Sequence, residues 1–130
     1  MTVKDQLTFS RHYTKLDNRA FKTVRWPDSV YFLGKTYHVV VVEKVGLFYR
    51  HKSLGWARIV RMDLAKLGEL ATEEFCLEDA GCLREEYFKL MMGWYRRKPD
   101  WRGWDSEVQV LSLVKESPKV EENQGRIDSV

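Results

Sequence analysis

The densest group of side chains that could do chemistry is the segment Arg19–Trp26, with the sequence RAFKTVRW. It places three cations and two aromatic rings within eight residues. Its alternation predicts a strand with Thr23 and Arg25 on one face and Lys22 and Trp26 on the other. Cations can meet phosphates while aromatic rings stack on bases, so this segment could bind nucleic acid. The alternative, which composition alone favours, is an exposed strand whose apolar residues are core and whose cations are solvated.

A second group lies in the segment Tyr95–Trp104, with the sequence YRRKPDWRGW. It holds four Lys or Arg residues, two tryptophans and a tyrosine, and it is predicted to be a loop. Tryptophans in a loop can be stacking platforms or contacts for a protein partner. Trp101 and Trp104 could equally fold back onto the core beside Trp94, and the sequence leaves both readings open.

Other familiar signatures are missing from the sequence. It has no glycine-rich phosphate loop and no nucleophile elbow, and the three histidines have no metal-ligand spacing. Cys76 and Cys82 are the only cysteines, and two cysteines without nearby histidines do not form a zinc site. We therefore expect no metal and no cofactor. Reduced thiols are the favoured interpretation of the cysteines, and a disulfide is the alternative.

Charge is unevenly distributed along the 130 residues. The net charge of +3 conceals 12 basic and 4 acidic side chains in residues 1–61, against 10 basic and 15 acidic in residues 62–130. Such an imbalance indicates one face suited to an anionic partner such as nucleic acid. No stretch approaches the ~20 apolar residues of a membrane span, and the N-terminus has no signal-peptide pattern. We therefore expect no membrane association and a cytoplasmic location.

Hydrophobic periodicity predicts an α+β fold. Strands are expected at 6–10, 21–26, 36–44, 56–62 and 106–115, and helices at 11–19, 72–79 and 83–97. Residues 45–50 remain ambiguous. Strands joined by short turns suggest a small β-barrel of about five to six strands with helices on its flank. Residues 1–116 are expected to form the domain, and residues 117–130 a polar, disordered tail.

The order of these elements resembles the ASCH domain, a member of the PUA-like superfamily. The resemblance covers about 7–114 and depends on short motifs: TFS before a short helix, the KTVR segment, a Gly-Lys turn before a valine-rich strand, GWARIVRM, and a Thr-Glu-Glu helix ending in Asp-x-Gly. It implies a PUA-like barrel with a cleft beside it that binds RNA or a nucleotide.

Some members of that family resemble small amidohydrolases that remove the acetyl group from N4-acetylcytidine, using a lysine, a threonine and an acidic residue. The resemblance places the threonine at Thr23, two residues before Arg25, and the acidic residue at Asp79. The position implied for the lysine is occupied by Ala20. Lys22 is nearby, and it could serve only if the register of the strand were shifted.

The sequence thus predicts an RNA- or nucleotide-binding module with a basic cleft. One wall would be formed by Arg19, Lys22, Thr23 and Arg25, with Trp26 and Arg58 near it and Asp79 on the far side. One alternative is an amidohydrolase of modified nucleosides with Lys22, Thr23 and Asp79 as catalytic residues. Another is a protein-interaction module that uses Trp101 and Trp104.

Overall fold

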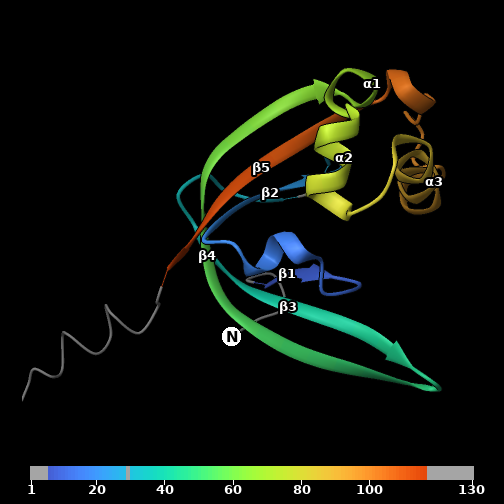
Figure 1. Cartoon of the computed structure of the whole chain (residues 1–130). Coiled ribbons are helices and arrows are strands. Elements are labelled where there is room, and N and C mark those ends of the chain that lie inside the picture. Colours follow the sequence, from blue (N-terminus) through green and yellow to red (C-terminus); the bar gives the residue numbers. More distant parts are fainter. Residues whose placement is uncertain (1–5, 29, 117–130) are drawn as a thin grey trace, which may run out of the picture.

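The computed structural model describes residues 6–28 and 30–116, and there the chain forms an α+β fold around one sheet (Figure 1). Five strands are hydrogen-bonded in the order β1-β3-β4-β5-β2. Their bounds are β1 Gln6–Phe9, β2 Ala20–Arg25, β3 Thr36–Val45, β4 Phe48–Lys66 and β5 Glu107–Glu116. β1 runs parallel to β3 and all other neighbours are antiparallel, so the sheet is mixed.

Three α-helices and two short 3₁₀ helices complete the described part of the chain. They are η2 (Thr14–Asp17), α1 (Leu67–Leu70), α2 (Glu73–Ala80), α3 (Arg84–Tyr95) and η3 (Gly103–Asp105). The side chain of Thr72 accepts the Phe75 amide at 3.1 Å and so caps the start of α2. Gly81 ends α2 in the left-handed conformation, with φ of 69°. No helix in these ranges is long and apolar enough to cross a membrane.

Most of the predicted elements are confirmed, and two differ. β4 has 19 residues instead of the predicted seven, because the ambiguous segment 45–50 forms a hairpin between β3 and β4. Gly46, with φ of 63°, provides the tight turn. Within 11–19, helical structure is limited to the four residues of η2. The predicted tail, 117–130, lies outside the described residues.

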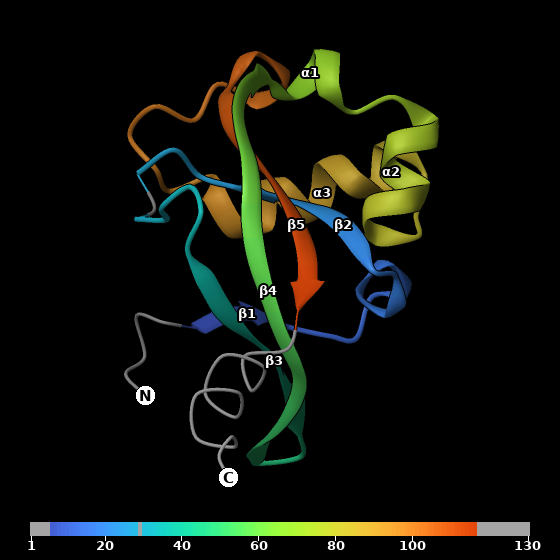
Figure 2. The ribbon, with the colours of Figure 1, turned by 90° about the vertical axis from the view of Figure 1, so that its left-hand side faces the viewer.

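The sheet curves strongly because β4 and β5 are long and bend together (Figure 1). Figure 2 shows these two strands side by side along the length of the sheet. β1 and β2 are its two edges, and no ladder joins them within the described ranges, so the sheet is open. The edges nevertheless approach each other, since the rings of Phe9 and Phe21 lie 6.3 Å apart. One apolar cluster fills the concave side of the sheet, and a second lies beneath the α-helices.

Candidate functional site

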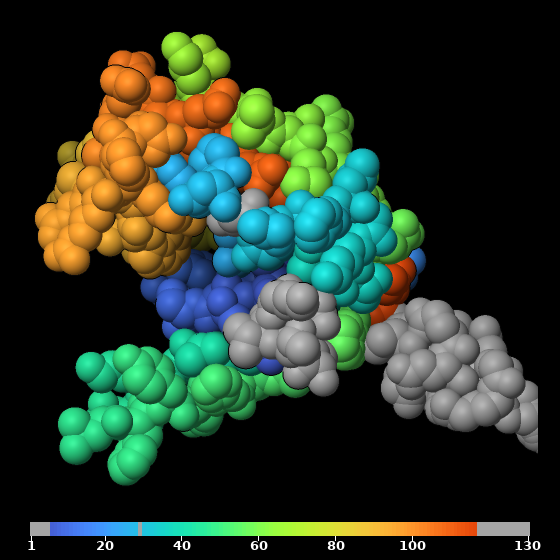
Figure 3. All heavy atoms as spheres, turned by 180° about the vertical axis from the view of Figure 1, so that it is seen from behind, coloured from blue at the N-terminus to red at the C-terminus, as the bar shows by residue number. Residues whose placement is uncertain are grey.

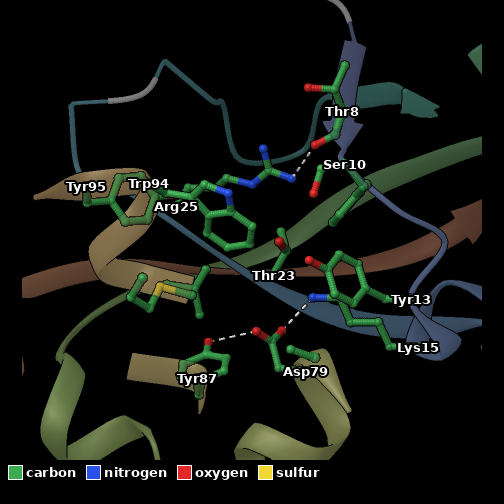
Figure 4. Close-up of a pocket in the computed structure, with 14 residues that line it drawn as sticks. Thr8, Ser10, Tyr13, Lys15, Thr23, Arg25, Asp79, Tyr87, Trp94 and Tyr95 are labelled. Atoms are coloured by element: carbon green, nitrogen blue, oxygen red, sulfur yellow. Dashed lines mark hydrogen bonds and ion pairs between the residues drawn. The ribbon is translucent and has the colours of Figure 1, made fainter. Parts of the chain in front are cut away.

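A central cavity of about 250 Å³ lies between the two apolar clusters (Figure 4). β1 and η2 form one side of it, β2 forms another, and the end of α2 together with α3 closes it. We call this space the central cavity. It is lined by Thr8, Phe9, Ser10, Tyr13, Lys15, Thr23, Val24, Arg25, Asp79, Ala80, Tyr87, Met91, Trp94 and Tyr95.

The most polar part of this wall is a buried chain of three side chains. The ammonium of Lys15 donates to the Asp79 carboxylate at 2.5 Å, and the Tyr87 hydroxyl donates to its other oxygen at 2.7 Å. Lys15 and Asp79 are each only 8% exposed. Because an unpaired buried charge is costly, these contacts hold the Asp79 carboxylate in one orientation at the cavity wall.

Burial changes the protonation of this chain. It lowers the pKa of Lys15 below its ordinary 10.5, and the nearby Arg25 guanidinium acts in the same direction, while Asp79 opposes the change. Burial, reinforced by the Asp79 charge, raises the pKa of Tyr87, so this hydroxyl stays protonated and donates. The cavity therefore contains a lysine that releases its proton more readily than a solvated one.

Arg25 extends across the opening between the two edges of the sheet. Its guanidinium donates to the Thr8 carbonyl oxygen at 2.9 Å, which links edge strand β2 to edge strand β1. It also lies 4.8 Å from the centre of the Phe9 ring, a cation–π distance. Arg25 is only partly buried, so it places a fixed positive charge at one side of the central cavity.

Two hydroxyl groups lie between Arg25 and the Lys15–Asp79 pair. Thr23 is 3% exposed, and Figure 4 shows its side chain between the guanidinium and the buried pair. The Tyr13 hydroxyl is buried and has no hydrogen-bond partner among the described residues. Buried polar atoms are nearly always paired, so an unsatisfied hydroxyl on a cavity wall is a natural contact for a ligand.

Lys22 lies on the other face of β2 and does not line the central cavity. It is exposed, and with Lys15 and Asp79 it borders a second, wider space of about 480 Å³ beside edge strand β2. The alternation of β2 confirms the predicted opposition of Thr23 and Lys22. β2 is paired with β5 in one unbroken register throughout its length, so the register shift that Lys22 would need to enter the central cavity is not present.

The structure places the other predicted site residues, namely Arg19 of the wall and Trp26 and Arg58 near it, away from the central cavity. Trp26 is 2% exposed, stacks on Tyr95 and donates to Asp100 at 3.2 Å, so it has no free face for a base. Arg58 projects from β4 on the side opposite the buried Ala57 and pairs with Glu116. Arg19 is exposed just before β2. Of the predicted site residues, Thr23, Arg25 and Asp79 are brought together around the cavity.

The loop tryptophans pack back onto the helical cluster. The Trp104 ring lies 4.4 Å from that of Phe88 and is covered by the Arg84 guanidinium at 4.0 Å. Trp101 lies 5.8 Å from Phe88 and 6.2 Å from Trp26. Both are only partly exposed, which favours the structural interpretation of this segment over a flat protein-binding patch.

The sequence analysis missed Lys15, Tyr13 and Tyr87, and Lys15 is the charged residue among them. Its only local signal is its position between Tyr13 and Leu16, whose spacing predicts an apolar helical face. A lysine beside such a face is ordinarily solvated, and its partner Asp79 is 64 residues away. Only the fold brings the two together. The described residues contain no group of His, Cys, Asp and Glu side chains that could hold a metal ion.

Compared with models of protein families, with curated proteins and with solved structures, the chain shows no match.

Proposed function

We propose that the protein binds a nucleobase, presented by RNA or by a free nucleotide or nucleoside, in the central cavity. The observation on which this depends is the combination of fixed polar groups within an aromatic enclosure. A base edge offers adjacent donors and acceptors, and Asp79, Thr23 and the unpaired Tyr13 hydroxyl can match them. The rings of Phe9, Tyr95 and their neighbours supply apolar walls for the flat faces of the base.

The positive charge of Arg25 favours a ligand in which the base is attached to an anionic group. Arg25 stands at the side of the cavity where the sheet edges approach each other, and it is held there by the Thr8 carbonyl. A guanidinium in this position can meet a phosphate or a ribose while the base enters the cavity. The two free thiols, Cys76 and Cys82, accord with a reducing compartment, in keeping with an intracellular nucleic-acid or nucleotide partner.

Membership of the ASCH domain family, with its PUA-like barrel, is part of the same proposal. What supports it is the observed order of strands and helices, the curvature that brings β1 and β2 together, and a cavity beside them. In this view the open sheet is a barrel whose last gap is spanned by Arg25 in place of a strand ladder.

The test is calorimetric titration with the four ribonucleosides and with N4-acetylcytidine. Thr23→Val and Asp79→Asn should each weaken the binding of the best ligand at least tenfold. Lys89→Met is the control for surface charge, because this exposed lysine lies on α3 and does not line the cavity. If no nucleoside binds the wild type, or if Lys89→Met weakens binding as much as the cavity variants, the proposal is wrong.

A second candidate is hydrolysis of an amide such as that of N4-acetylcytidine, and the observation that favours it is Lys15. Burial lowers the pKa of Lys15, so this side chain, which lies next to the Asp79 carboxylate in the same cavity as Thr23, loses its proton at a lower pH than a solvated lysine. The amine would take the proton of Thr23 as Oγ1 attacks the acyl carbon, and would pass it to the departing nitrogen. Water would then cleave the resulting ester, and Arg25 could stabilise the oxyanion.

This reaction has its own test, separate from binding. Incubation with N4-acetylcytidine should release cytidine and acetate, with a rate that rises with pH as Lys15 loses its proton. Lys15→Met should abolish release. If cytidine does not form at high protein concentration although the nucleoside binds, the protein is a binding module and the hydrolase candidate is excluded.

A further inference from the structure

The hairpin formed by the outer halves of β3 and β4 extends beyond the rest of the sheet (Figure 1). β1 pairs with β3 only as far as Phe9 and Val41. From Val42 to the turn and back to His51, the two strands are therefore paired only with each other. We call residues 42–53 the arm. A two-stranded hairpin with so few packing partners is only marginally stable in water, so the length of the arm calls for an explanation.

The side chains of the arm are unusual for a solvated hairpin. Leu47 is 92% exposed, Phe48 77% and Tyr49 63%. Between residues 43 and 52 the arm also carries Lys44, Arg50, His51 and Lys52 against a single acidic residue, Glu43. Exposed rings interleaved with cations are typical of surfaces that bind nucleic acid.

The inner face of the arm leads towards the central cavity. Phe48, Arg50 and Lys52 alternate along β4, and Lys52 is directly opposite the buried Val41. This face therefore continues the concave, core-bearing side of the sheet. The ammonium of Lys52 donates to His12 Nδ1 at 2.8 Å, immediately before the cavity residue Tyr13. One ring and two cations thus follow this face from the tip of the arm to His12, and Arg50 among them is paired with Glu43 at 3.1 Å on the same face.

A second basic segment lies across from the arm. Trp94 lines the cavity and is 46% exposed, and after it Arg96 and Arg97 are exposed at the end of α3. Figure 3 shows a hollow between the arm, at the lower left, and the segment that follows α3, at the upper left. The N-terminal strand lies at the floor of this hollow. Exposed cations therefore occur in both segments that border the hollow, and the strand at its floor contributes Thr8 and Phe9 to the central cavity.

We infer that the arm is a second contact for single-stranded RNA, so that the ligand of the central cavity is a base within an RNA chain and not a free nucleoside. This inference depends on the proposed binding of a nucleobase. Phe48 stacks on a base outside the cavity, and Lys52 and Arg50 contact the phosphates between that base and the one in the cavity. The alternation of the strand places these groups about 7 Å apart.

The distribution of charge favours RNA over a lipid surface or a second copy of the chain. A membrane contact needs only the apolar tip, whereas the cations here continue along the inner face to His12 beside the cavity. A symmetric contact of arm on arm with a second copy would bring like charges together. A polyanion such as RNA that lies along the hollow can contact the cations of both bordering segments at the same time.

The test measures two ligands on the same variants at equal salt: the nucleoside that binds best and a ten-nucleotide single-stranded RNA containing it. RNA should bind the wild type more tightly than the nucleoside. Phe48→Ala should weaken RNA binding about tenfold and leave nucleoside binding unchanged. Arg50→Ala should weaken RNA binding and reduce the slope of log K against log salt by about 0.7.

Arg61→Ala is the matched control for Arg50→Ala. Both arginines are exposed residues of β4 with one carboxylate partner each, Asp63 for Arg61 and Glu43 for Arg50, but Arg61 lies outside the arm. If RNA binds no more tightly than the nucleoside, the inference that the arm contacts RNA is wrong, while the proposal that the cavity binds a nucleobase still stands. Absence of nucleoside binding would instead contradict the cavity proposal. Phe48-dependent binding to anionic phosphatidylserine vesicles, or Phe48-dependent dimers in sedimentation, with unchanged RNA affinity would overturn the inference.

Discussion

The ammonium of Lys15 and the carboxylate of Asp79 form an ion pair at 2.5 Å, and the two side chains are 8% and 7% exposed. Lys15 comes from a single 3₁₀ turn between β1 and β2, whereas Asp79 lies in the last turn of α2. At the cavity wall, the pair therefore links the 3₁₀ turn η2, which lies between the two edge strands in the sequence, to helix α2. Since the Tyr87 hydroxyl also donates to Asp79, the pair is anchored to α3 as well.

Lys15→Met should lower the free energy of unfolding by about 3–5 kcal/mol, because it leaves the buried Asp79 carboxylate without its counter-ion. Lys15→Met/Asp79→Asn should recover much of this loss, since the asparagine carbonyl can still accept from Tyr87 and no charge remains. Urea denaturation of the wild type and both variants measures the difference. A single variant as stable as the wild type would mean that the pair does not form. The double variant should remain unable to bind a nucleobase ligand tightly, which separates stability from function.

The pH dependence of stability should reveal Lys15. Burial lowers its pKa below 10.5, so between the lowered value and 10.5 the unfolded chain holds a proton that the folded chain has released. The free energy of unfolding of the wild type, relative to Lys15→Met, should therefore rise with pH across this window and level off on either side. Urea denaturation at a series of pH values from about 7 to about 11.5 measures the difference. A difference that falls as pH rises would contradict the lowered pKa.

Much of the fold was predictable because local signals agree with the tertiary structure. Helix α2 begins after Thr72 and ends before Gly81, as the capping preferences of these two residues predict. The alternation of β2 places Thr23 and Lys22 on opposite faces of the strand. The length of β4 was not predictable from periodicity, because its outer half has little core to face and so lacks an alternating apolar pattern. For this part, pairing with β3 decides the structure.

The site was predictable only where one element supplies it. Thr23 and Arg25 share a face of one strand, and a strand's period of two reveals this directly. Lys15 and Tyr87 belong to it through contacts between distant elements, and no short spacing encodes them. Trp26, in contrast, was predicted to lie near the site and does not. Its position beside cations suggested stacking on a base, but the ring is buried against Tyr95 and Trp101.

Two tryptophans should therefore respond differently to truncation. Trp26→Ala should lower the free energy of unfolding by about 3–5 kcal/mol, because it removes a 2% exposed ring from the helical cluster. Trp94→Ala should cost about 1 kcal/mol or less, since this ring is half exposed, but it should weaken the binding of a nucleobase ligand at the cavity wall. Thermal denaturation and calorimetric titration of both variants measure the two effects. Equal loss of stability in the two variants would contradict this division.

The N-terminal cap of α2 should control access to Cys76. This thiol is 0% exposed, and burial raises its pKa to about 11, so it reacts with an alkylating reagent only when α2 opens. Thr72→Ala removes the hydroxyl that accepts the Phe75 amide and should destabilise the helix by about 1 kcal/mol. In a Cys82→Ser background, iodoacetamide should label Cys76 about fivefold faster in Thr72→Ala than in the parent, with Thr72→Ser close to the parent. Because the same helix holds Asp79 at the cavity, Thr72→Ala should also weaken the binding of a nucleobase ligand. An unchanged rate of Cys76 labelling in Thr72→Ala would mean that α2 opens independently of its cap.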